Sequence, residues 1–475
     1  MQLNKQNLIT ALGSNLLSIK GDFIVENYSI DTRTLKVGDC FIALKDKTDG
    51  HQYLSNAIEK GALSLLITEE FFSQNPINFP NLIIVKDTYL ALKEIAEFTA
   101  NTLKKNGGEL IGITGSVGKT TLKEMLQFVL SQNNKVSSTL GNFNNHIGLP
   151  FSLAHLKADS DFGVFEMGMS SVGEISFLVN ILKPRIAVIT EIAAAHTEFF
   201  NSSDKSPLDL IAEAKSEIIE GLNEKSVLFL NFDNQYFNFL KEKAQNKGVK
   251  EIITFSQNNP SADIYVKTTN LQNNYYTEVS ASIFGMEVSY KINSMALHNA
   301  MLSALALGIA RKLNIDIKKT LENFGDFKIP KGRGAISKIN FDDKNITLID
   351  DSYNASPKSM NSAILSLSSV SSKKVIILGD MLELGESKEK EHIALKDSLQ
   401  KVNNIKEVIL IGKLMQNLYN EANDSIKMQH FNNFEESLSY IKNILDDGDL
   451  VFIKGSLGSG VINISKYLQS NMNNL

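Results

Sequence analysis

Residues 110–122 read LIGITGSVGKTTL, and this stretch decides the fold class. Its apolar start, Leu110 to Ile113, predicts a short buried strand. The segment Gly115 to Gly118 predicts a tight loop, and the apolar spacing after Lys119 predicts a helix. A strand, a glycine loop and a helix in this order are the setting of a phosphate-binding loop.

The loop suits an anion because small residues let several backbone N–H groups approach it, and the helix N-terminus adds partial positive charge. Lys119 would reach the outer phosphates, and the Thr120 hydroxyl would hold Mg²⁺. Ile113 stands where the longer pattern has glycine, so this is the shorter T-G-x-x-G-K-T-T variant. An ordinary tight turn is the alternative, but the Gly-Lys-Thr-Thr run favours a nucleotide site. That site would comprise Gly115, Ser116, Val117, Gly118, Lys119, Thr120 and Thr121.

Length and composition limit the class of protein. A chain of 475 residues is expected to form roughly two to four domains. Its net charge of −5, without a basic block, argues against a nucleic-acid partner. Cys40 is the only cysteine, which excludes an intrachain disulfide and suits the cytoplasm. The first residues lack a signal-peptide pattern, and no apolar run reaches membrane-spanning length, so we expect no membrane span.

Three segments differ in pattern, and we expect an α/β protein with one domain in each. Residues 1–86 predict a small α/β domain that begins with a helix from Asn7 to Leu17. Residues 87–313 alternate strands and helices around the phosphate loop, which predicts a central P-loop ATPase domain with a mostly parallel sheet. Residues 314–475 alternate again, which predicts a doubly wound, Rossmann-like C-terminal domain.

Two polar residues follow predicted strands of the central domain. Glu166 ends the strand 162–166, and His196 lies just past the strand 186–190. In open α/β sheets, ligands bind at the carboxyl ends of the strands. A carboxylate beside a triphosphate is favourable when Mg²⁺ lies between them, so we predict Glu166 and His196 as metal ligands. The alternatives are a helix cap for Glu166 and an ordinary loop histidine for His196.

Lys215 lies on a predicted helix that begins at Ser206. At about 100° per residue it shares one stripe with Ile211, Ile218 and Leu222, so its amine points with the apolar face. Lysines in such places commonly extend to the edge of the apolar surface, and that interpretation stays open.

Further polar clusters follow strands of the C-terminal domain and turns of the first. The C-terminal clusters are Asp350 to Asn354, Gly379 to Met381 and Lys454 to Ser456. Arg333 stands between glycines, where it could clamp a phosphate or lie in a solvated turn. The N-terminal clusters are Asp31-Thr32-Arg33 and Asp49-Gly50-His51, which taken alone are interpreted as turn residues.

Together these motifs resemble those of the Mur ligases of peptidoglycan synthesis, over nearly the whole chain. The motifs that carry the resemblance are ITGSVGKTT, GNFNNHIGLP, FEMG, AAAHTE, EAKSEI, KGRG, DDSYNASPKSM and LGDMLELG. GNFNN and DSYNASP favour the family member that joins D-alanyl-D-alanine to UDP-N-acetylmuramoyl-tripeptide. The resemblance therefore implies these two substrates, and a place at the last cytoplasmic step of precursor synthesis.

The resemblance also implies roles for single residues. For catalysis it implies Lys119, Lys215 and His196. As Mg²⁺ ligands it implies Thr120, Glu166, His196 and a carbamylated Lys215. For the nucleotide it adds Asn299, Arg333 and Asp351 to the phosphate loop. For the substrate it implies Thr32 and Arg33 at the uridine-nucleotide end, with Asn142, Asn144 and Asn145 in GNFNN. Leu302 departs from the family, which often has a second asparagine there.

The implied activity is ATP-dependent, ADP-forming amide ligation through an acyl phosphate, by a cytoplasmic enzyme that we expect to be a monomer. One alternative is another Mur ligase or a folylpolyglutamate-synthase-like ligase, although a folate enzyme is not expected to carry the Asp31 and Asp49 clusters. An alternative from a different class is a P-loop NTPase switch. A GTP switch usually shows an Asn-Lys-x-Asp motif, which this sequence lacks.

Overall fold

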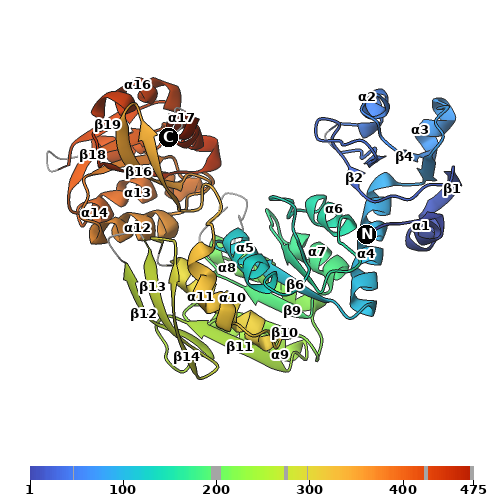
Figure 1. Cartoon of the computed structure of the whole chain (residues 1–475), viewed down its shortest axis with the longest axis horizontal. Helices are drawn as coiled ribbons and strands as arrows, with labels where there is room; N and C mark the ends of the chain where they lie inside the picture. The colour runs from blue at the N-terminus through green and yellow to red at the C-terminus, as the bar shows by residue number, and fades with distance from the viewer. Residues whose placement is uncertain (47, 194–204, 272–275, 297, 422–425, 471–475) are drawn as a thin grey trace.

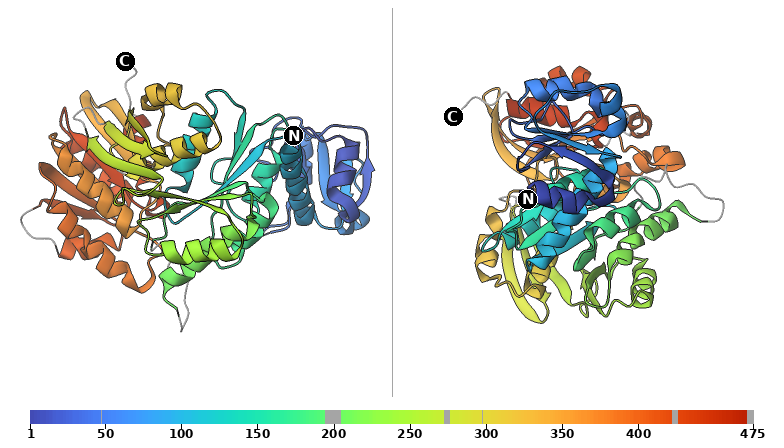
Figure 2. Two further views of the ribbon diagram at one scale, coloured as in Figure 1. Left: turned by 90° about the horizontal axis from the view of Figure 1, so that it is seen from below. Right: turned by 90° about the vertical axis from the view of Figure 1, so that its right-hand side faces the viewer.

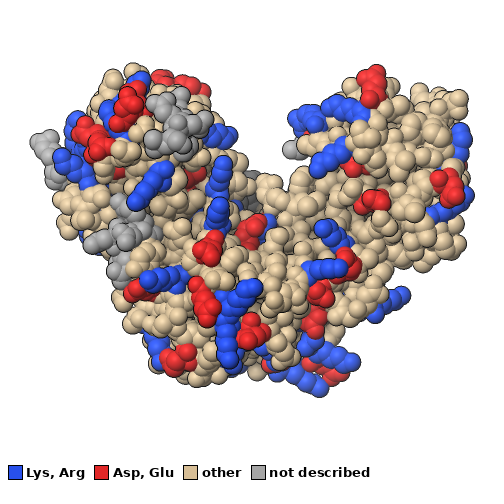
Figure 3. Space-filling model, in the orientation of Figure 1, with Lys and Arg blue, Asp and Glu red and all other residues tan. Residues whose placement is uncertain are grey.

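The computed structural model describes residues 1–46, 48–193, 205–271, 276–296, 298–421 and 426–470. Within these residues the strands form sheets of five, nine and six strands, and helices pack against them (Figure 1). The predicted α/β fold class is therefore confirmed, and all three sheets are mostly parallel. The units that hold the first and third sheets lie at opposite ends of the central one (Figure 2), and the surface is hollowed between them (Figure 3).

The first sheet has the order β1-β5-β4-β3-β2, and β1 is antiparallel to β5. Its strands are β1 (Leu16–Lys20), β2 (Tyr28–Ser29), β3 (Cys40–Ile42), β4 (Ser64–Thr68) and β5 (Leu82–Val85). Its helices are α1 (Lys5–Leu12), α2 (Leu54–Glu59) and α3 (Glu69–Gln74). The predicted helix from Asn7 to Leu17 is wrong at its end. Gly13 adopts φ 47° and stops α1, and the chain then pairs as β1.

Helix α4 (Thr88–Lys105) joins the first two units. The Asp87 side chain caps it by accepting a 2.9 Å hydrogen bond from the Leu90 N–H. Ala91, Leu92 and Ile95 pack in the core of the first unit, and Ala96, Ala100 and Leu103 pack in the central core. One continuous helix therefore connects both cores.

The central sheet has the order β14-β13-β12-β11-β10-β9-β6-β8-β7. It is parallel from β7 to β12, and β13 and β14 are antiparallel additions at one edge. The strands are β6 (Glu109–Thr114), β7 (Val136–Ser138), β8 (Phe162–Glu166), β9 (Ile186–Ile189), β10 (Val227–Asn231), β11 (Glu251–Ser256), β12 (Ile264–Leu271), β13 (Thr277–Ile283) and β14 (Met286–Ile292). The helices are α5 (Lys119–Leu130), α6 (Gly148–Ala154), α7 (Glu174–Leu182), α8 (Pro207–Ser216), α9 (Phe237–Asn246), α10 (His298–Lys312) and α11 (Lys318–Asn323).

The third sheet has the order β15-β16-β20-β17-β18-β19, with only β15 antiparallel to its neighbour. The strands are β15 (Ala335–Phe341), β16 (Lys344–Asp351), β17 (Lys374–Gly379), β18 (Ile405–Ile411), β19 (Met428–Phe431) and β20 (Leu450–Lys454). The helices are α12 (Pro357–Ser366), α13 (Lys388–Ile393), α14 (Leu395–Leu399), α15 (Met415–Asn420), α16 (Phe434–Ile444) and α17 (Ile462–Ser470).

The boundaries 86/87 and 313/314 stay predictions, and packing bears on the second of them. Ile317, Phe324 and Ile329 lie in the hydrophobic core of the central unit, although they follow residue 314. This packing favours a boundary closer to the start of β15. None of the helices in the described part of the chain combines the length and apolar character that crossing a bilayer requires.

Candidate active site

The phosphate loop connects β6 to α5. Gly118 is the N-cap residue of α5 and has φ 88°, a conformation that glycine adopts without steric cost. A Cβ on Gly115 would lie 2.0 Å from the Thr190 hydroxyl oxygen, so a larger residue would displace the loop. The Lys119 ammonium donates a 2.6 Å hydrogen bond to the Gly115 carbonyl oxygen. Lys119 therefore folds back over the loop, where an anion would meet it.

The segment after β9 holds this loop in place. The Ser116 N–H donates to the Glu191 carbonyl oxygen at 2.6 Å, and its hydroxyl donates to the Ala193 carbonyl oxygen at 2.9 Å. The Thr190 hydroxyl donates to the Val117 carbonyl oxygen at 2.6 Å. The loop is thus fixed by its neighbours before any ligand binds, which lowers the ordering cost of binding.

Glu166 ends β8 beside the loop and is fully buried, with 0% of its surface exposed. One carboxylate oxygen accepts a 2.8 Å hydrogen bond from the Thr120 hydroxyl. The other, Oε1, is buried and has no hydrogen-bond partner among the described residues. Glu166 does not cap the next helix, because α7 begins at Glu174. A buried carboxylate oxygen without a partner is costly, and a cation would satisfy it.

Lys215 lies near the end of α8 and is buried, with 3% of its surface exposed. The described residues place no carboxylate in an ion pair with its ammonium. Burial lowers the pKa of Lys215 well below its ordinary value, and the nearby Lys119 ammonium lowers it further. Its side chain therefore does not extend to solvent, and its amine is neutral much more readily than a surface lysine.

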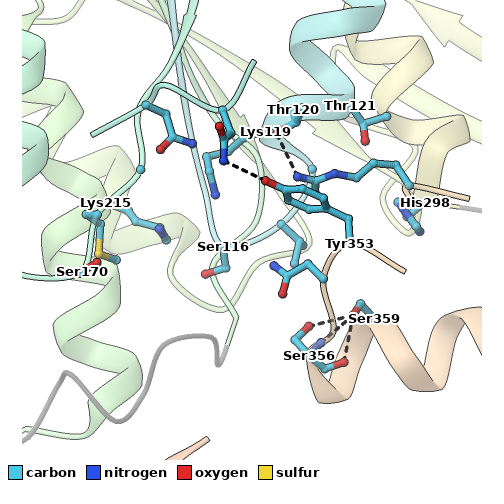
Figure 4. Close-up of a pocket in the computed structure, with 18 of the residues that line it drawn as sticks. Ser116, Lys119, Thr120, Thr121, Ser170, Lys215, His298, Tyr353, Ser356 and Ser359 are labelled. Carbon is cyan, nitrogen blue, oxygen red and sulfur yellow. Dashed lines mark hydrogen bonds between the residues drawn. The ribbon is translucent and has the colours of Figure 1, made fainter. Parts of the chain in front are cut away.

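One cavity of about 390 Å³ joins the phosphate loop to the C-terminal unit. Among the residues predicted from the sequence, its lining includes Ser116, Val117, Gly118, Lys119, Thr120, Thr121, Asn142, Asn144, Asn145, Lys215, Arg333 and Asp351. Figure 4 shows Lys119 and Thr120 on one side of this cavity and Ser356 and Ser359 of the C-terminal unit on another.

The C-terminal unit contributes charged groups to this cavity. Arg333 Nη2 donates to the Thr120 hydroxyl oxygen at 3.2 Å. Asp351 forms a 2.7 Å ion pair with Lys454, which is itself buried. The ordered Asp351 carboxylate and the Arg333 guanidinium could therefore both act on a ligand seated on the phosphate loop.

The GNFNN segment forms the cavity wall next to β8. The Asn142 Nδ2 donates to the Tyr353 hydroxyl at 3.1 Å. The Asn144 carbonyl oxygen accepts from the Gly168 N–H at 2.8 Å. The Asn145 side chain accepts from the Gly148 N–H at 2.8 Å, so part of its capacity is used inside the protein.

Other predicted residues lie elsewhere. Asn299 is buried, its Nδ2 donates to Ser294 at 2.8 Å, and it does not line the cavity. Thr32 and Arg33 belong to the first unit and do not line it either. The Arg33 side chain is 87% exposed and pairs with Asp31 at 2.6 Å.

His196 falls within residues 194–204, which lie outside the described residues. Its metal role stays a prediction. His51, from the second N-terminal cluster, is buried in a 3₁₀ helix from Gly50 to Tyr53, and Asp49 holds its ring at 2.6 Å.

Several cavity residues had no role in the sequence-based prediction, among them Tyr353, Lys454 and His298. Tyr353 and Lys454 stand at the carboxyl ends of β16 and β20. The sequence signal for Tyr353 and Lys454 was their position at the end of a strand, which their sequence neighbours share. Only the tertiary contacts in the structure distinguish them from those neighbours.

The donors around Glu166 fit a magnesium ion. Oxygen atoms of carboxylates and hydroxyls are the ligands that Mg²⁺ prefers, and Glu166 and Thr120 supply them. No group of three histidine, cysteine or acidic side chains suited to a metal occurs in the ranges that the structure describes. A cation here would therefore also need oxygen atoms from its substrate, water or a modified residue.

The chain is similar to known families and proteins. Residues 113–310 match the model of the Mur ligase middle domain, and residues 337–457 match that of the Mur ligase, glutamate ligase domain. The UDP-N-acetylmuramoyl-tripeptide–D-alanyl-D-alanine ligase of Rickettsia prowazekii (strain Madrid E) is 33% identical, covering 98% of this chain and 99% of that protein.

The chain belongs to the Mur ligase family.

The enzyme of the same name from Bacillus subtilis (strain 168) is 32% identical, over 94% of this chain and 93% of its own. Solved structures of this family have the same fold. MurF from Acinetobacter baumannii covers 99% of this chain and 98% of its own, with a TM-score of 0.82 and 24% identity. The MurF ligase from Thermotoga maritima in complex with ADP covers 94% of this chain and 98% of its own, with a TM-score of 0.77 and 24% identity. This Mur ligase therefore shares the fold of both over nearly its whole length.

Proposed function

We propose that this chain is the ATP-dependent ligase that joins D-alanyl-D-alanine to UDP-N-acetylmuramoyl-tripeptide, with release of ADP and phosphate. The observation that carries the proposal is a single cavity that unites the phosphate loop and Lys215 with Arg333 and Asp351 of another unit. Relatives named for this activity, at 33% and 32% identity over nearly the full chain, support the same substrates.

The reaction needs two substrates and a phosphoryl group held in line. The tripeptide carboxylate attacks the terminal phosphorus of ATP, which forms an acyl phosphate and releases ADP. The neutral amine of the dipeptide then attacks the acyl carbon and gives a tetrahedral species. This species expels phosphate and loses a proton, which leaves the new amide. Holding these groups in one geometry supplies much of the rate in such reactions.

The residues around the phosphate loop are placed for this work. Lys119 and the N-terminus of α5 would neutralise charge on the transferred phosphoryl group. Arg333 would approach the same group from the C-terminal unit, since it already contacts Thr120 at 3.2 Å. Asp351, paired with Lys454, would contact the remainder of the nucleotide. Asn299 has this role only through the family resemblance, since its buried side chain does not line the cavity.

Mg²⁺ is part of the proposal, held by Thr120, Glu166, His196 and a carbamylated Lys215. When bound, the ion supplies positive charge that offsets the charge developing on the phosphoryl oxygens. Carbamylation requires a neutral amine, and burial provides one at Lys215 by lowering its pKa. The carbamate converts a cation into an anion with two oxygens, which suits a hard metal ion.

The acceptor side is assigned to the GNFNN segment and the first unit. Asn142 and Asn144 line the cavity and would contact the peptide, whereas Asn145 also caps α6. Thr32 and Arg33 would contact the uridine nucleotide across the hollow between the units. The proposal includes a cytoplasmic, monomeric enzyme, in keeping with its single cysteine and its nucleotide-linked substrate.

Membership of the Mur ligase family excludes the alternative of a P-loop NTPase switch. The share of the chain that a folate enzyme covers argues against the alternative of a folylpolyglutamate-synthase-like ligase. The L. casei FPGS structure covers 79% of this chain with a TM-score of 0.55, against 99% and 0.82 for MurF from Acinetobacter baumannii. An earlier Mur ligase is the remaining alternative, and substrate choice distinguishes it.

ADP release is expected to require UDP-N-acetylmuramoyl-tripeptide, D-alanyl-D-alanine and Mg²⁺ together. A coupled assay with each component omitted in turn measures this requirement, and mass spectrometry identifies the condensed product. A panel of single amino acids and other UDP-muramoyl peptides serves as control. Steady ATP turnover without an acceptor, or condensation with a single amino acid instead of the dipeptide, would refute the proposal.

Nucleotide affinity is expected to fall as pH rises through about 8. Desolvation lowers the pKa of Lys119 to about 8, Arg333 adds to this effect, and Glu166 opposes it. The triphosphate binds the charged amine, so affinity is full below this pKa and decreases above it. If only the charged form binds, affinity falls up to about tenfold between pH 7 and pH 9. Calorimetric titration measures this, and Lys119→Met should show no such slope. An unchanged wild-type affinity at pH 9 would contradict the assignment of Lys119.

A further inference from the structure

Tyr353 connects two walls of the cavity that come from distant parts of the chain. Its hydroxyl accepts a 3.1 Å hydrogen bond from Asn142, which precedes it by 211 residues. Its ring lies under the Arg333 guanidinium, at 4.3 Å from the ring centroid. Figure 4 shows Tyr353 projecting into the cavity toward the phosphate loop, with the hydrogen bond of its hydroxyl dashed.

The backbone fixes this stack. The Tyr353 N–H donates to the Gly332 carbonyl oxygen at 3.0 Å. Gly332 has φ 74°, and a Cβ there would lie 2.9 Å from the Tyr353 Cβ, so glycine permits the close approach. The Gly332 N–H also donates to the Asp350 carboxylate at 3.2 Å. Arg333, as the next residue, therefore has its position tied to that of Tyr353.

The contacts continue to the phosphate loop. Arg333 donates to the Thr120 hydroxyl at 3.2 Å, and that hydroxyl donates to Glu166 at 2.8 Å. Asn142, Tyr353, Arg333 and Thr120 thus form an unbroken series of contacts. One end lies in the GNFNN segment, and the other lies where the terminal phosphate would be held.

We propose that Tyr353 is a positioning residue that couples the two substrate sites of this enzyme. When the peptide substrate orders the segment around Asn142, the Tyr353 hydroxyl is held, and its ring keeps Arg333 over the phosphate loop. Occupation of either site then strengthens binding at the other by the same factor. This inference rests on the proposed function, because it requires that the peptide substrate contacts Asn142.

We expect only a modest coupling between binding of the peptide substrate and binding of the nucleotide. A hydrogen bond between neutral groups changes an equilibrium by about three- to tenfold. We therefore expect saturating UDP-N-acetylmuramoyl-tripeptide to tighten binding of a non-hydrolysable ATP analogue by up to about tenfold. In Tyr353→Phe, which keeps the ring but lacks the hydroxyl, this factor should fall to near one, while affinity for the analogue alone is unchanged.

Four further variants sharpen the test. Tyr353→Leu removes the ring, so it should also weaken binding of the analogue alone. Asn142→Ala should reduce the coupling factor as Tyr353→Phe does, and the double variant should show no additional loss. Tyr419→Phe makes the same change on α15, away from the cavity, and should keep the wild-type factor.

The outcomes separate this inference from the function on which it rests. Wild-type protein without acceptor-dependent ADP release would overturn both. Wild-type release and coupling, together with an unchanged factor in folded Tyr353→Phe, would overturn only the role of Tyr353. Additive losses in the Asn142→Ala/Tyr353→Phe double variant would do the same, because they would show that the two side chains act separately.

Discussion

Lys215→Ala is expected to lower kcat by about 10²- to 10³-fold while the protein remains folded, the size of effect seen when one charge-stabilising group is removed. Lys215 is buried beside the phosphate loop, and its ammonium repels that of Lys119. A plain cation at this position would also repel Mg²⁺. The carbamate removes both conflicts, so the activity should depend on the modified side chain.

Short carboxylic acids should restore part of the activity of Lys215→Ala, since acetate can place two oxygen atoms in the vacated space. Acetate should not stimulate Lys241→Ala, which changes an exposed lysine on α9. Incubation with ¹³C-labelled bicarbonate should give a carbamate carbon signal in the wild-type protein and none in Lys215→Ala. Near wild-type turnover by Lys215→Ala, or no labelled carbon in the wild type, would contradict the carbamate proposal.

Much of the fold could be predicted because its strongest signals are local. The apolar segment Leu110 to Ile113, followed by the glycine loop, is β6 and its turn into α5 in the structure. Short strands and strands at or near sheet edges give weaker signals. β1 and β15 are edge strands whose pairing depends on β5 and β16, and β7 has three residues. Of these, only β7 is too short for a period to be recognised.

In the candidate site, too, some residues could be predicted from local sequence patterns and others could not. The loop residues and Glu166 could be grouped from the sequence because each follows a parallel strand of one sheet. The contact between Arg333 and Thr120 spans 213 residues, and that between Asn142 and Tyr353 spans 211. Such pairs depend on how the units are arranged, which no local pattern encodes. The sequence likewise could not predict that one carboxylate oxygen of Glu166 lacks a hydrogen-bond partner, because this depends on burial and hydrogen bonding in the folded protein.

Glu166→Gln is expected to lower Mg²⁺-dependent turnover by about 10²-fold or more and to abolish stabilisation of the protein by Mg²⁺. Glutamine keeps the shape of the side chain and can still accept from the Thr120 hydroxyl, but it lacks the charge. In the wild type, a cation that binds the folded state raises the midpoint of thermal unfolding. Calorimetry at increasing Mg²⁺ with a non-hydrolysable ATP analogue measures this rise without requiring activity.

Glu109→Gln provides the matched control for this experiment. Glu109 is the first residue of β6, and the phosphate loop follows the last residue of that strand. Like Glu166, Glu109 has a buried carboxylate oxygen, Oε2, without a hydrogen-bond partner among the described residues. Its other oxygen pairs with Arg185 at 2.9 Å. If a buried, incompletely paired acid were enough, both variants would respond to Mg²⁺ alike. If Glu166 holds the cation, Glu109→Gln keeps the Mg²⁺-dependent rise and Glu166→Gln loses it. A rise retained in Glu166→Gln would mean that the cation binds elsewhere and that Glu166 serves mainly to orient the Thr120 hydroxyl.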